Sequence, residues 1–256
     1  MKFSNAIVKR PCKSMVDGIT TADFGSPDYE LAVVQHNKYI EALDKAGLEV
    51  TILDADEDYP DSVFVEDPAI VTDDFAVITN PGAESRKGEI EAIETAIKEF
   101  YPATKIHKIE SPGTLDGGDV LQIENTLYIG LSDRTNKTGA EQLSEIAATY
   151  GYKTINMAIN DLLHLKSGVS YIGDNTMLMV AYFLGRPEFS KFNQILLGDS
   201  EAYAANSVRV NDYLIIPSGY PMAKNKLETS GFKLITLDLS EFRKLDGGLS
   251  CLSLRF

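Results

Sequence analysis

A repeated order of strand and helix signals is the feature of this 256-residue chain that most constrains its fold. Four stretches have the pattern of β-hairpins, because two apolar runs flank a short polar turn in each. These stretches are residues 69–79, 120–130, 169–181 and 207–217. A helical or short turn segment follows each hairpin, and an isolated apolar strand follows that segment. The order strand–strand–helix–strand therefore repeats roughly every fifty residues, a period that indicates a repeat architecture.

The helical segments of the repeat differ in how clear their apolar periodicity is. Residues 84–100 give the clearest pattern, with Ile90, Ile93 and Ile97 on one face. The other segments of this kind are residues 139–150, 186–192 and 222–230, of which the last two are weaker. The isolated strands that follow the four segments are residues 105–109, 154–159, 194–197 and 233–238.

The N-terminal region supplies a fifth, incomplete copy of the unit. A helix over residues 28–46 leads into a strand over residues 49–54. The missing hairpin requires the C-terminal strand, residues 252–256, to lie beside the N-terminal strand, residues 3–9. The sequence therefore predicts an α/β fold, a five-bladed pseudo-symmetric ring closed by the two terminal strands. The same signals also fit an ordinary mixed α/β sheet. We prefer the ring because the polar residues then converge.

Composition restricts the class of protein. The formal net charge is −14 and the sequence pI is about 4.6, which argues against nucleic acid as the main partner, since phosphate binding requires a basic surface. Two cysteines do not make a disulfide framework. No apolar run has the length of a signal-peptide core or of a membrane span, so we expect a cytoplasmic protein.

Unusual polar residues collect between each isolated strand and the next hairpin. These junction segments are residues 61–68, 114–119, 163–168, 204–206 and 246–251. In a ring of repeats, equivalent segments point to one place. Carboxylates from two units, a histidine from a third and a cysteine from a fifth would then meet near the axis, as in a catalytic site assembled from distant parts of a chain.

Each junction has a simpler interpretation when it is taken alone. The acidic pair at residues 66–67 could belong to a solvated loop. The segment after Asp116 could be only a hairpin entry, in which Gly117 and Gly118 adopt positive φ. His164 lies in an apolar run and could be a satisfied core histidine. Only the convergence of the segments favours a catalytic site.

Cys251 is the candidate nucleophile. It follows a Gly-Gly turn and precedes the final short strand, where a backbone bend could hold the sulfur in a cleft. An unpaired cysteine is by itself more often structural than catalytic. A thiolate nucleophile needs a partner for proton transfer. Of His36, His107 and His164, only His164 follows the unit pattern, and Cys12 is expected to be inert.

A cysteine, a histidine and several carboxylates suit attack on the planar carbon of a guanidinium. A carboxylate can accept hydrogen bonds from two N–H groups of a guanidinium at once. Carboxylates also hold the positive charge of the guanidinium near the sulfur, where that charge favours the thiolate over the thiol. The histidine protonates the leaving amine and then acts as the base for the water that hydrolyses the thiouronium. Arg86 and Arg134 occupy the same position after successive hairpins and would bind a substrate carboxylate; either alone could be an ordinary surface arginine.

The chain resembles the dimethylarginine dimethylaminohydrolases, guanidino-group-modifying enzymes with the pentein fold, a five-bladed ββαβ propeller, and is most similar to the bacterial type. The matching stretches are residues 16–20, 28–29, 35–37, 64–68, 81–86, 163–166, 203–206, 219–221 and 246–256. They span essentially the whole chain without a large insertion.

The resemblance implies a role for each matching residue. Cys251 is expected to be the nucleophile and His164 the general acid and base. Asp116 falls at the family's third catalytic carboxylate, where bacterial relatives commonly carry Glu and mammalian ones Asp. The expected substrate contacts are Asp67 with Glu66 for the guanidinium, Asp61 and the carbonyl of Ile19 for the α-amino group, and Arg86 with Arg134 for the α-carboxylate.

The resemblance also implies a function and its alternatives. We expect residues 1–256 to form a single catalytic pentein domain that hydrolyses Nω-methylated arginine to citrulline and methylamine or dimethylamine through a cysteine thiouronium. We expect no metal, no organic cofactor, and no nucleic-acid or membrane partner. We expect the protein to form a homodimer, and residues 16–25 to form a flap over the site. The alternatives are an arginine deiminase type, a citrulline-hydrolysing relative, and a non-catalytic binding protein like the ribosome anti-association factor with this propeller fold.

Overall fold

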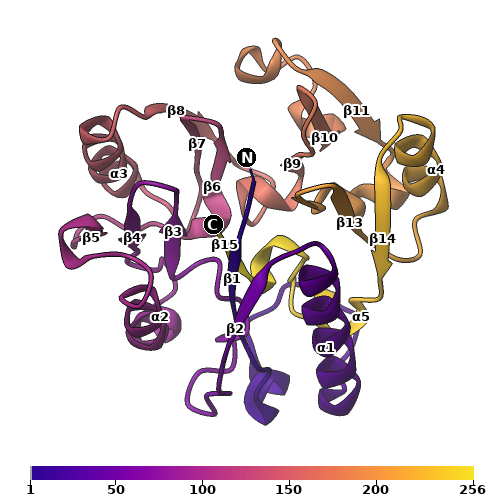
Figure 1. Ribbon diagram of the computed structural model, residues 1–256. Coiled ribbons are helices and arrows are strands. Elements are labelled where there is room, and N and C mark those ends of the chain that lie inside the picture. Colours follow the sequence, from indigo (N-terminus) through magenta and orange to yellow (C-terminus); the bar gives the residue numbers. More distant parts are fainter. Residues whose placement is uncertain (1) are drawn as a thin grey trace.

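Five small three-stranded sheets surround a common centre in the computed structural model, which describes residues 2–256 (Figure 1). The topology is the same in all five sheets: the inner strand is antiparallel to the middle strand, and the middle strand is parallel to the outer one. This is the repeated strand–strand–helix–strand unit that the sequence predicts. The protein is thus a mixed α/β propeller rather than one continuous sheet.

The strands fall into three sets by their place in the sheets. The inner strands are β3 (Ala69–Val71), β6 (Val120–Ile123), β9 (Val169–Tyr171), β12 (Val208–Val210) and β15 (Leu254–Arg255). The middle strands are β4 (Ala76–Ile78), β7 (Thr126–Leu131), β10 (Thr176–Val180), β13 (Tyr213–Pro217) and β1 (Asn5–Lys9). The outer strands are β5 (Ile106–Lys108), β8 (Lys153–Ala158), β11 (Asn193–Leu197), β14 (Lys233–Leu237) and β2 (Glu49–Leu53).

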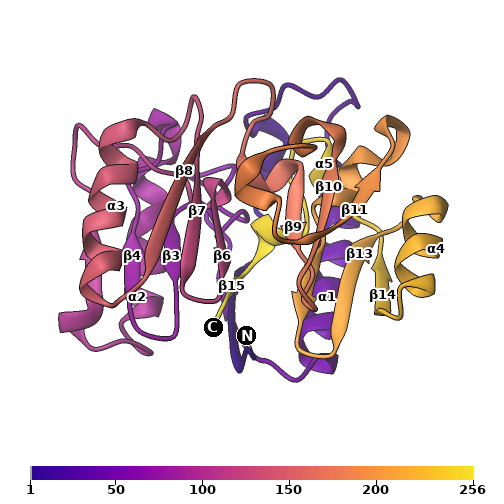
Figure 2. The same ribbon diagram turned by 90° about the horizontal axis from the view of Figure 1, so that it is seen from above.

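In four of the five sheets an α-helix connects the middle strand to the outer strand, because a parallel pair needs a crossover connection. These helices are α1 (Tyr29–Lys45), α2 (Ile90–Ile97), α3 (Lys137–Thr149) and α4 (Pro221–Thr229), and they lie on the outside of the propeller (Figures 1 and 2). Side chains cap two of them: Asp28 accepts from the amide of Leu31 at the start of α1, and Asn136 accepts from the amide of Gly139 in α3. A short helix, α5 (Ser240–Arg243), precedes the C-terminal segment.

Two helical segments differ from the prediction. Residues 84–100 do not form one helix: a 3₁₀ segment over Glu84–Glu89 precedes α2. A Cβ on Gly88 would come within 1.9 Å of the Tyr59 hydroxyl oxygen, so this turn passes directly against a neighbouring loop. Residues 186–192 contain only a 3₁₀ turn, Pro187–Phe189. Gly185 has a φ of +78° just before it, a conformation that no helix contains.

The two terminal strands lie in one sheet, as predicted (Figure 2). β1 pairs antiparallel with β15, with Ala6 opposite Arg255 and Ile7 opposite Leu254, and parallel with β2. Tyr39 of helix α1 contacts the segment before β15. The buried hydroxyl of Tyr39 donates to the carbonyl oxygen of Leu249, at 2.9 Å, and lies 2.7 Å from the hydroxyl of Ser253. The C-terminal segment is therefore held by both a strand partner and a helix.

Across residues 2–256, no helix has the length and apolar character needed to cross a membrane.

We expect Tyr39→Phe to destabilise the protein by about 1–3 kcal/mol, because the Leu249 carbonyl group loses its buried donor. Tyr128→Phe is the matched control: the Tyr128 hydroxyl is buried and, within the described chain, has no hydrogen-bond partner. Its removal should be neutral or stabilising. Urea unfolding of the two variants measures both effects. Equal loss of stability in both would contradict the role of the Tyr39 hydrogen bonds.

Candidate active site

The three predicted catalytic residues and Asp67, the predicted guanidinium ligand, lie in the junctions that precede the inner strands. Asp67 is in the turn before β3, and Asp116 immediately precedes the 3₁₀ turn Gly117–Asp119 before β6. His164 immediately precedes the 3₁₀ turn Leu165–Ser167 before β9. Cys251 lies in the 3₁₀ turn Ser250–Leu252 before β15. Because the inner strands surround the common centre, the ring brings these four junctions together from widely separated parts of the chain (Figure 1).

One small pocket of about 50 Å³ collects eight of the nine predicted site residues. They are Ile19, Asp61, Asp67, Arg86, Asp116, Arg134, His164 and Cys251. The side chains of Thr21, Phe64, Leu163, Leu245 and Asp246 complete the lining, together with Gly247. The predicted convergence of the junctions is therefore present in the structure. Glu66 is the exception and is described below.

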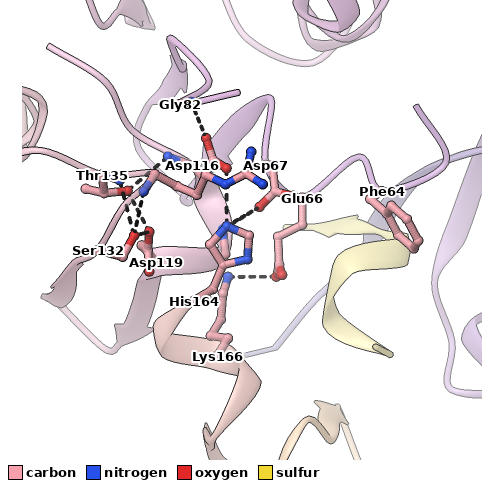
Figure 3. Close-up of polar contacts among 12 residues, drawn as sticks. Phe64, Glu66, Asp67, Gly82, Asp116, Asp119, Ser132, Thr135, His164 and Lys166 are labelled. Carbon is pink, nitrogen blue, oxygen red and sulfur yellow. Dashed lines mark hydrogen bonds and ion pairs between the residues drawn. The ribbon is translucent and has the colours of Figure 1, made fainter. Parts of the chain in front are cut away.

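Two carboxylates lie near one nitrogen of the His164 ring (Figure 3). Its Nε2 atom is 3.2 Å from Oδ2 of Asp116 and 4.0 Å from Oδ1 of Asp67. Burial alone would lower the pKa of this imidazole, but the charge of Asp67 and the hydrogen bond with Asp116 outweigh it and raise the pKa to about 9. His164 is therefore protonated at neutral pH, the state that a general acid requires.

Asp67 connects three segments of the site. Its carboxylate accepts a hydrogen bond from the amide of Gly118 at 2.9 Å and pairs with Nη1 of Arg86 at 2.5 Å. Burial opposes ionisation, but the positive charges of His164 and Arg86 prevail and hold the pKa of Asp67 below its usual value. Asp67 is thus the ionised carboxylate beside the imidazole.

The two glycines after Asp116 allow other segments to approach their Cα atoms closely. Neither is among the glycines with φ above zero in the described chain, so positive φ is not their role. A Cβ on Gly117 would come within 2.0 Å of the Glu66 carbonyl oxygen. A Cβ on Gly118 would come within 2.8 Å of both Oδ1 of Asp67 and Nδ1 of His164. Side chains at these positions would displace the acidic junction from the histidine.

Asp119 fixes the loops that carry His164 and Arg134 (Figure 3). Its Oδ2 accepts from the hydroxyls of Ser132, at 2.6 Å, and Thr135, at 2.7 Å, on either side of Arg134. Its Oδ1 accepts from the amide of Leu165 at 2.9 Å. Asp119 is fully buried and has a supporting role that the sequence did not predict, although it belongs to the same Asp-Gly-Gly-Asp motif as Asp116.

The two predicted carboxylate-binding arginines differ in how many donors remain free. The guanidinium of Arg86 donates to Glu89, to Asp67 and to the carbonyl oxygens of Asp61 and Phe64. Within residues 2–256, the guanidinium of Arg134 makes no hydrogen bond or ion pair. Arg134 is therefore the cation that can receive an anion, and Arg86 is largely committed to the protein. The buried partner Glu89 was not predicted, although its spacing of three residues from Arg86 could have indicated a pair.

Glu66 faces away from the pocket. Its carboxylate accepts from Lys166 Nζ at 2.7 Å and from the Ser250 hydroxyl at 2.7 Å, and Arg255 Nη2 lies 3.6 Å away. It lines a separate cavity of about 330 Å³ at the centre of the propeller. Glu66 and Asp67 lie in an irregular turn, and the two residues line different cavities. In this structure Glu66 supports the cysteine segment instead of lining the pocket.

The predicted flap lies against the pocket and is held by two carboxylates. Asp61 accepts from the amide of Ile19 at 3.1 and 3.2 Å. Asp246 accepts from the amide of Thr21 at 2.7 Å and from its hydroxyl at 3.0 Å. Burial raises the pKa of Asp61. The carboxylate of Asp61 and the backbone of Ile19 thus lie together, as their predicted role with an α-amino group requires.

Cys251 is a free thiol whose surroundings oppose ionisation. Burial, followed by the negative charges of Glu66 and Asp67, raises the pKa of the thiol to about 12. With these protein neighbours the sulfur is therefore protonated at neutral pH. A cation next to it would reverse part of this effect, since positive charge favours the thiolate.

A metal ion could use three of these residues. Ligand atoms of Asp67, Asp116 and His164 lie within 4.8 Å of one another. The two carboxylates already face the positive charges of Arg86 and of protonated His164, so a cation there would have to compete with both. The cluster has a sufficient explanation in hydrogen bonding.

The chain is similar to known proteins of one family. Residues 26–184 match the family model described as "N,N dimethylarginine dimethylhydrolase, eukaryotic". The chain is 45% identical over 254 residues to the N(G),N(G)-dimethylarginine dimethylaminohydrolase of Pseudomonas aeruginosa, covering 99% of this chain and 100% of the relative. It is 35% identical to the protein of the same name from Streptomyces coelicolor, covering 100% of this chain and 98% of the relative.

A solved structure gives the same result. The chain superposes with a TM-score of 0.98 on a cysteine-to-serine variant of the P. aeruginosa enzyme complexed with citrulline. Sequence identity is 44%, and the match covers 100% of both chains.

We expect His164 and His36 to change stability with pH in opposite directions. The pKa of His164 is raised to about 9, so its stabilisation is complete below pH 6.5 and is lost as the pH rises through 9. Burial, with a smaller effect of Arg10, lowers the pKa of His36 to about 4, so its stabilisation is present above pH 6.5 and is lost as the pH falls through 4.

The measurement is the pH dependence of urea unfolding in wild type, His164→Gln and His36→Gln, with NMR titration of the imidazole signals of the wild type. The difference in free energy of unfolding between wild type and His164→Gln should shrink as the pH rises from about 6.5 to 9. The corresponding difference for His36→Gln should shrink as the pH falls from about 6.5 to 4. An imidazole of His164 that titrates at or below pH 6.5 would contradict the electrostatic description of the site.

Proposed function

Because the chain belongs to the dimethylarginine dimethylaminohydrolase family, we propose that it hydrolyses Nω-methylated arginine to citrulline and methylamine or dimethylamine. The observation that carries this proposal is the pocket in which Cys251, protonated His164 and the carboxylates of Asp67 and Asp116 converge. A thiol, an acid and two anions around one small space suit nucleophilic attack on a planar cation. The structure with citrulline bound supports an amino acid of this class as the ligand.

The proposed substrate orientation follows from the charges along the pocket. The guanidinium lies against Asp67 and Asp116 beside His164, where charge-assisted N–H···O bonds can form. At the other end, Asp61 and the carbonyl of Ile19 receive the α-amino group. Arg134 receives the α-carboxylate through donors that no described protein group occupies. Glu66 acts on the guanidinium only indirectly, through Ser250.

The substrate itself promotes formation of the nucleophile. A guanidinium in the pocket offsets the negative charge of Asp67, which together with burial raises the pKa of Cys251. The thiol then releases its proton to solvent, and the thiolate attacks the guanidinium carbon, forming a C–S bond and a tetrahedral adduct. The proton of His164 passes to the departing amine nitrogen as the C–N bond breaks, which leaves a thiouronium on the sulfur.

Water completes the reaction with the same histidine. Neutral His164 accepts a proton from water as its oxygen attacks the thiouronium carbon. The C–S bond breaks as the hydroxyl proton of the adduct passes to the sulfur, which returns Cys251 to the thiol and releases citrulline. Asp116, hydrogen-bonded to His164, orients the ring and stabilises its charged form in both steps.

Further parts of the proposal concern the whole protein. We propose that residues 1–256 act as one catalytic domain, because residues from Ile19, near the N-terminus, to Cys251, near the C-terminus, line the same pocket. We also propose a homodimer in the cytoplasm that works without a metal or organic cofactor, as the family resemblance implies. Sedimentation equilibrium and activity after dialysis against a chelator test the assembly and the metal.

We expect citrulline release from asymmetric dimethylarginine and monomethylarginine, little from arginine, and none with Cys251→Ala. The reason is that the thiolate forms the only covalent bond that activates the carbon in this mechanism. Parallel colorimetric assays of the three compounds measure the selectivity. Preference for arginine would place the protein with the deiminase type, and full turnover by Cys251→Ser would refute the mechanism. Inactivity towards all guanidino compounds would revive a binding role.

We expect Arg134→Gln and Arg86→Gln to act on different properties. Loss of Arg134 removes a charged hydrogen-bond donor to the substrate and should raise KM at least about tenfold with little change in stability. Loss of Arg86 leaves Asp67 and Glu89 without their buried cation, so the free energy of unfolding should fall by about 3–5 kcal/mol. Michaelis–Menten kinetics and urea unfolding of both variants decide this. A stable Arg86→Gln with only a raised KM would restore the simpler assignment of both arginines to the α-carboxylate.

A further inference from the structure

Asn206 is the polar residue of the fourth junction, and neither the pocket nor the proposed reaction assigns it a role. It lies between the 3₁₀ segment Asp199–Ala205 and β12, in the junction that corresponds to the junctions of Asp67, Asp116, His164 and Cys251. Its side chain is buried, with 6% of the residue exposed. It lines the central cavity rather than the pocket that contains Cys251.

The amide of Asn206 joins the two segments that carry the reacting groups. Its Oδ1 accepts from the backbone amide of Ser250 at 2.9 Å. Its Nδ2 donates to the Ser250 hydroxyl at 3.1 Å and to the carbonyl oxygen of Lys166 at 3.1 Å. Ser250 immediately precedes Cys251, and Lys166 follows His164 by two residues. One side chain therefore connects the nucleophile segment directly to the acid–base segment.

Two further contacts make this connection rigid. Glu66 accepts from both the Ser250 hydroxyl and Lys166 Nζ, so Asn206, Ser250, Glu66 and Lys166 form a closed set of hydrogen bonds and one ion pair. A Cβ on Gly248 would come within 2.6 Å of the Asn206 side chain, so the turn before Cys251 passes directly over the amide. Buried networks whose members are all satisfied hold their parts in one arrangement.

We propose that Asn206 is a positioning residue that fixes the sulfur of Cys251 relative to the imidazole of His164. The role rests on the proposed function, since it concerns the geometry of that reaction. An asparagine suits it because the amide offers an acceptor and two donors in one plane, and here all of them bind the two segments. A displacement of about 1 Å between reacting groups can lower a rate about 10²-fold.

The test is Asn206→Ala, measured by kcat and KM for monomethylarginine and by thermal unfolding. We expect kcat to fall about 10²-fold and KM to change less than about threefold, because none of the groups that bind the substrate's ends contacts Asn206. If Asn206→Ala does not fold, Asn206→Ser, which keeps one hydroxyl in place of the amide, is measured in the same way.

Asn211→Ala is the matched control. Its amide makes the same pattern of bonds elsewhere: Oδ1 accepts from the Phe3 amide, and Nδ2 donates to the carbonyl oxygens of Phe3 and Ala46. Asn211 also has a φ of +51°, so alanine there adds backbone strain to the loss of three bonds. We expect this variant to lose at least as much thermal stability as Asn206→Ala and to keep kcat within about twofold.

Alkylation of Cys251 by iodoacetamide provides a readout that needs no substrate, in a Cys12→Ser background. Release of the segment should hydrate the thiol and lower its pKa from about 12, so Asn206→Ala should react faster at pH 8 than wild type, and Asn211→Ala should not. The expected gain is about threefold for each pKa unit, because a less basic thiolate is also less nucleophilic. If the wild type releases no citrulline, the proposed function fails, and alkylation alone decides the role of Asn206.

The outcomes separate positioning from general stabilisation. A large fall in kcat for Asn206→Ala alone, with faster alkylation, supports the proposal. Retention of kcat within about twofold, or an equal fall in kcat for Asn211→Ala, overturns it. Unchanged alkylation in Asn206→Ala overturns it as well, since the nucleophile segment would then be fixed by other contacts.

Discussion

The buried negative charge of Asp67 is the constraint on which the site depends. Its carboxylate is almost completely removed from solvent, yet it stays ionised because Arg86, His164 and the amide of Gly118 surround it. A buried charge of this kind is tolerated only with excellent partners, and removing one partner is costly. The histidine segment and the glycine turn are therefore positioned by the same charge that holds the imidazole protonated.

This arrangement gives the pocket a preference for cations. Four carboxylates line it, those of Asp61, Asp67, Asp116 and Asp246. Arg86 is neutralised by Glu89 as well as by Asp67, so its charge is not available in full to a ligand. The thiol of Cys251 remains protonated among these anions, with a pKa of about 12. A planar cation both satisfies the anions and permits the thiolate, so recognition and activation depend on the same interaction.

The sequence was sufficient to predict the repeat, because hairpin turns and apolar alternation are local signals. It also indicated which junctions meet, since equivalent positions of a ring point to one centre. It could not show that Glu66 and Asp67 face different cavities, because the turn at that point has no regular period. Nor could it show whether Gly117 and Gly118 serve positive φ, as the simpler interpretation of this segment holds. In the structure they do not, and the neighbouring backbone and His164 leave no space for a Cβ. Close approach between segments that are distant in the chain has no local signature.

The pseudo-symmetry explains why one junction differs from the other four. A five-fold ring provides five equivalent positions, but this site uses four of them for groups that line the pocket: Asp67, Asp116, His164 and Cys251. Thiol, imidazole and carboxylates must be held to a fraction of an ångström, and each lies on a short turn that strand pairing alone does not fix. The remaining position carries Asn206, an uncharged amide that binds two of those turns without altering the charge of the pocket. A charged residue there would act on the pKa of the nearby thiol, whereas an amide supplies the connection alone.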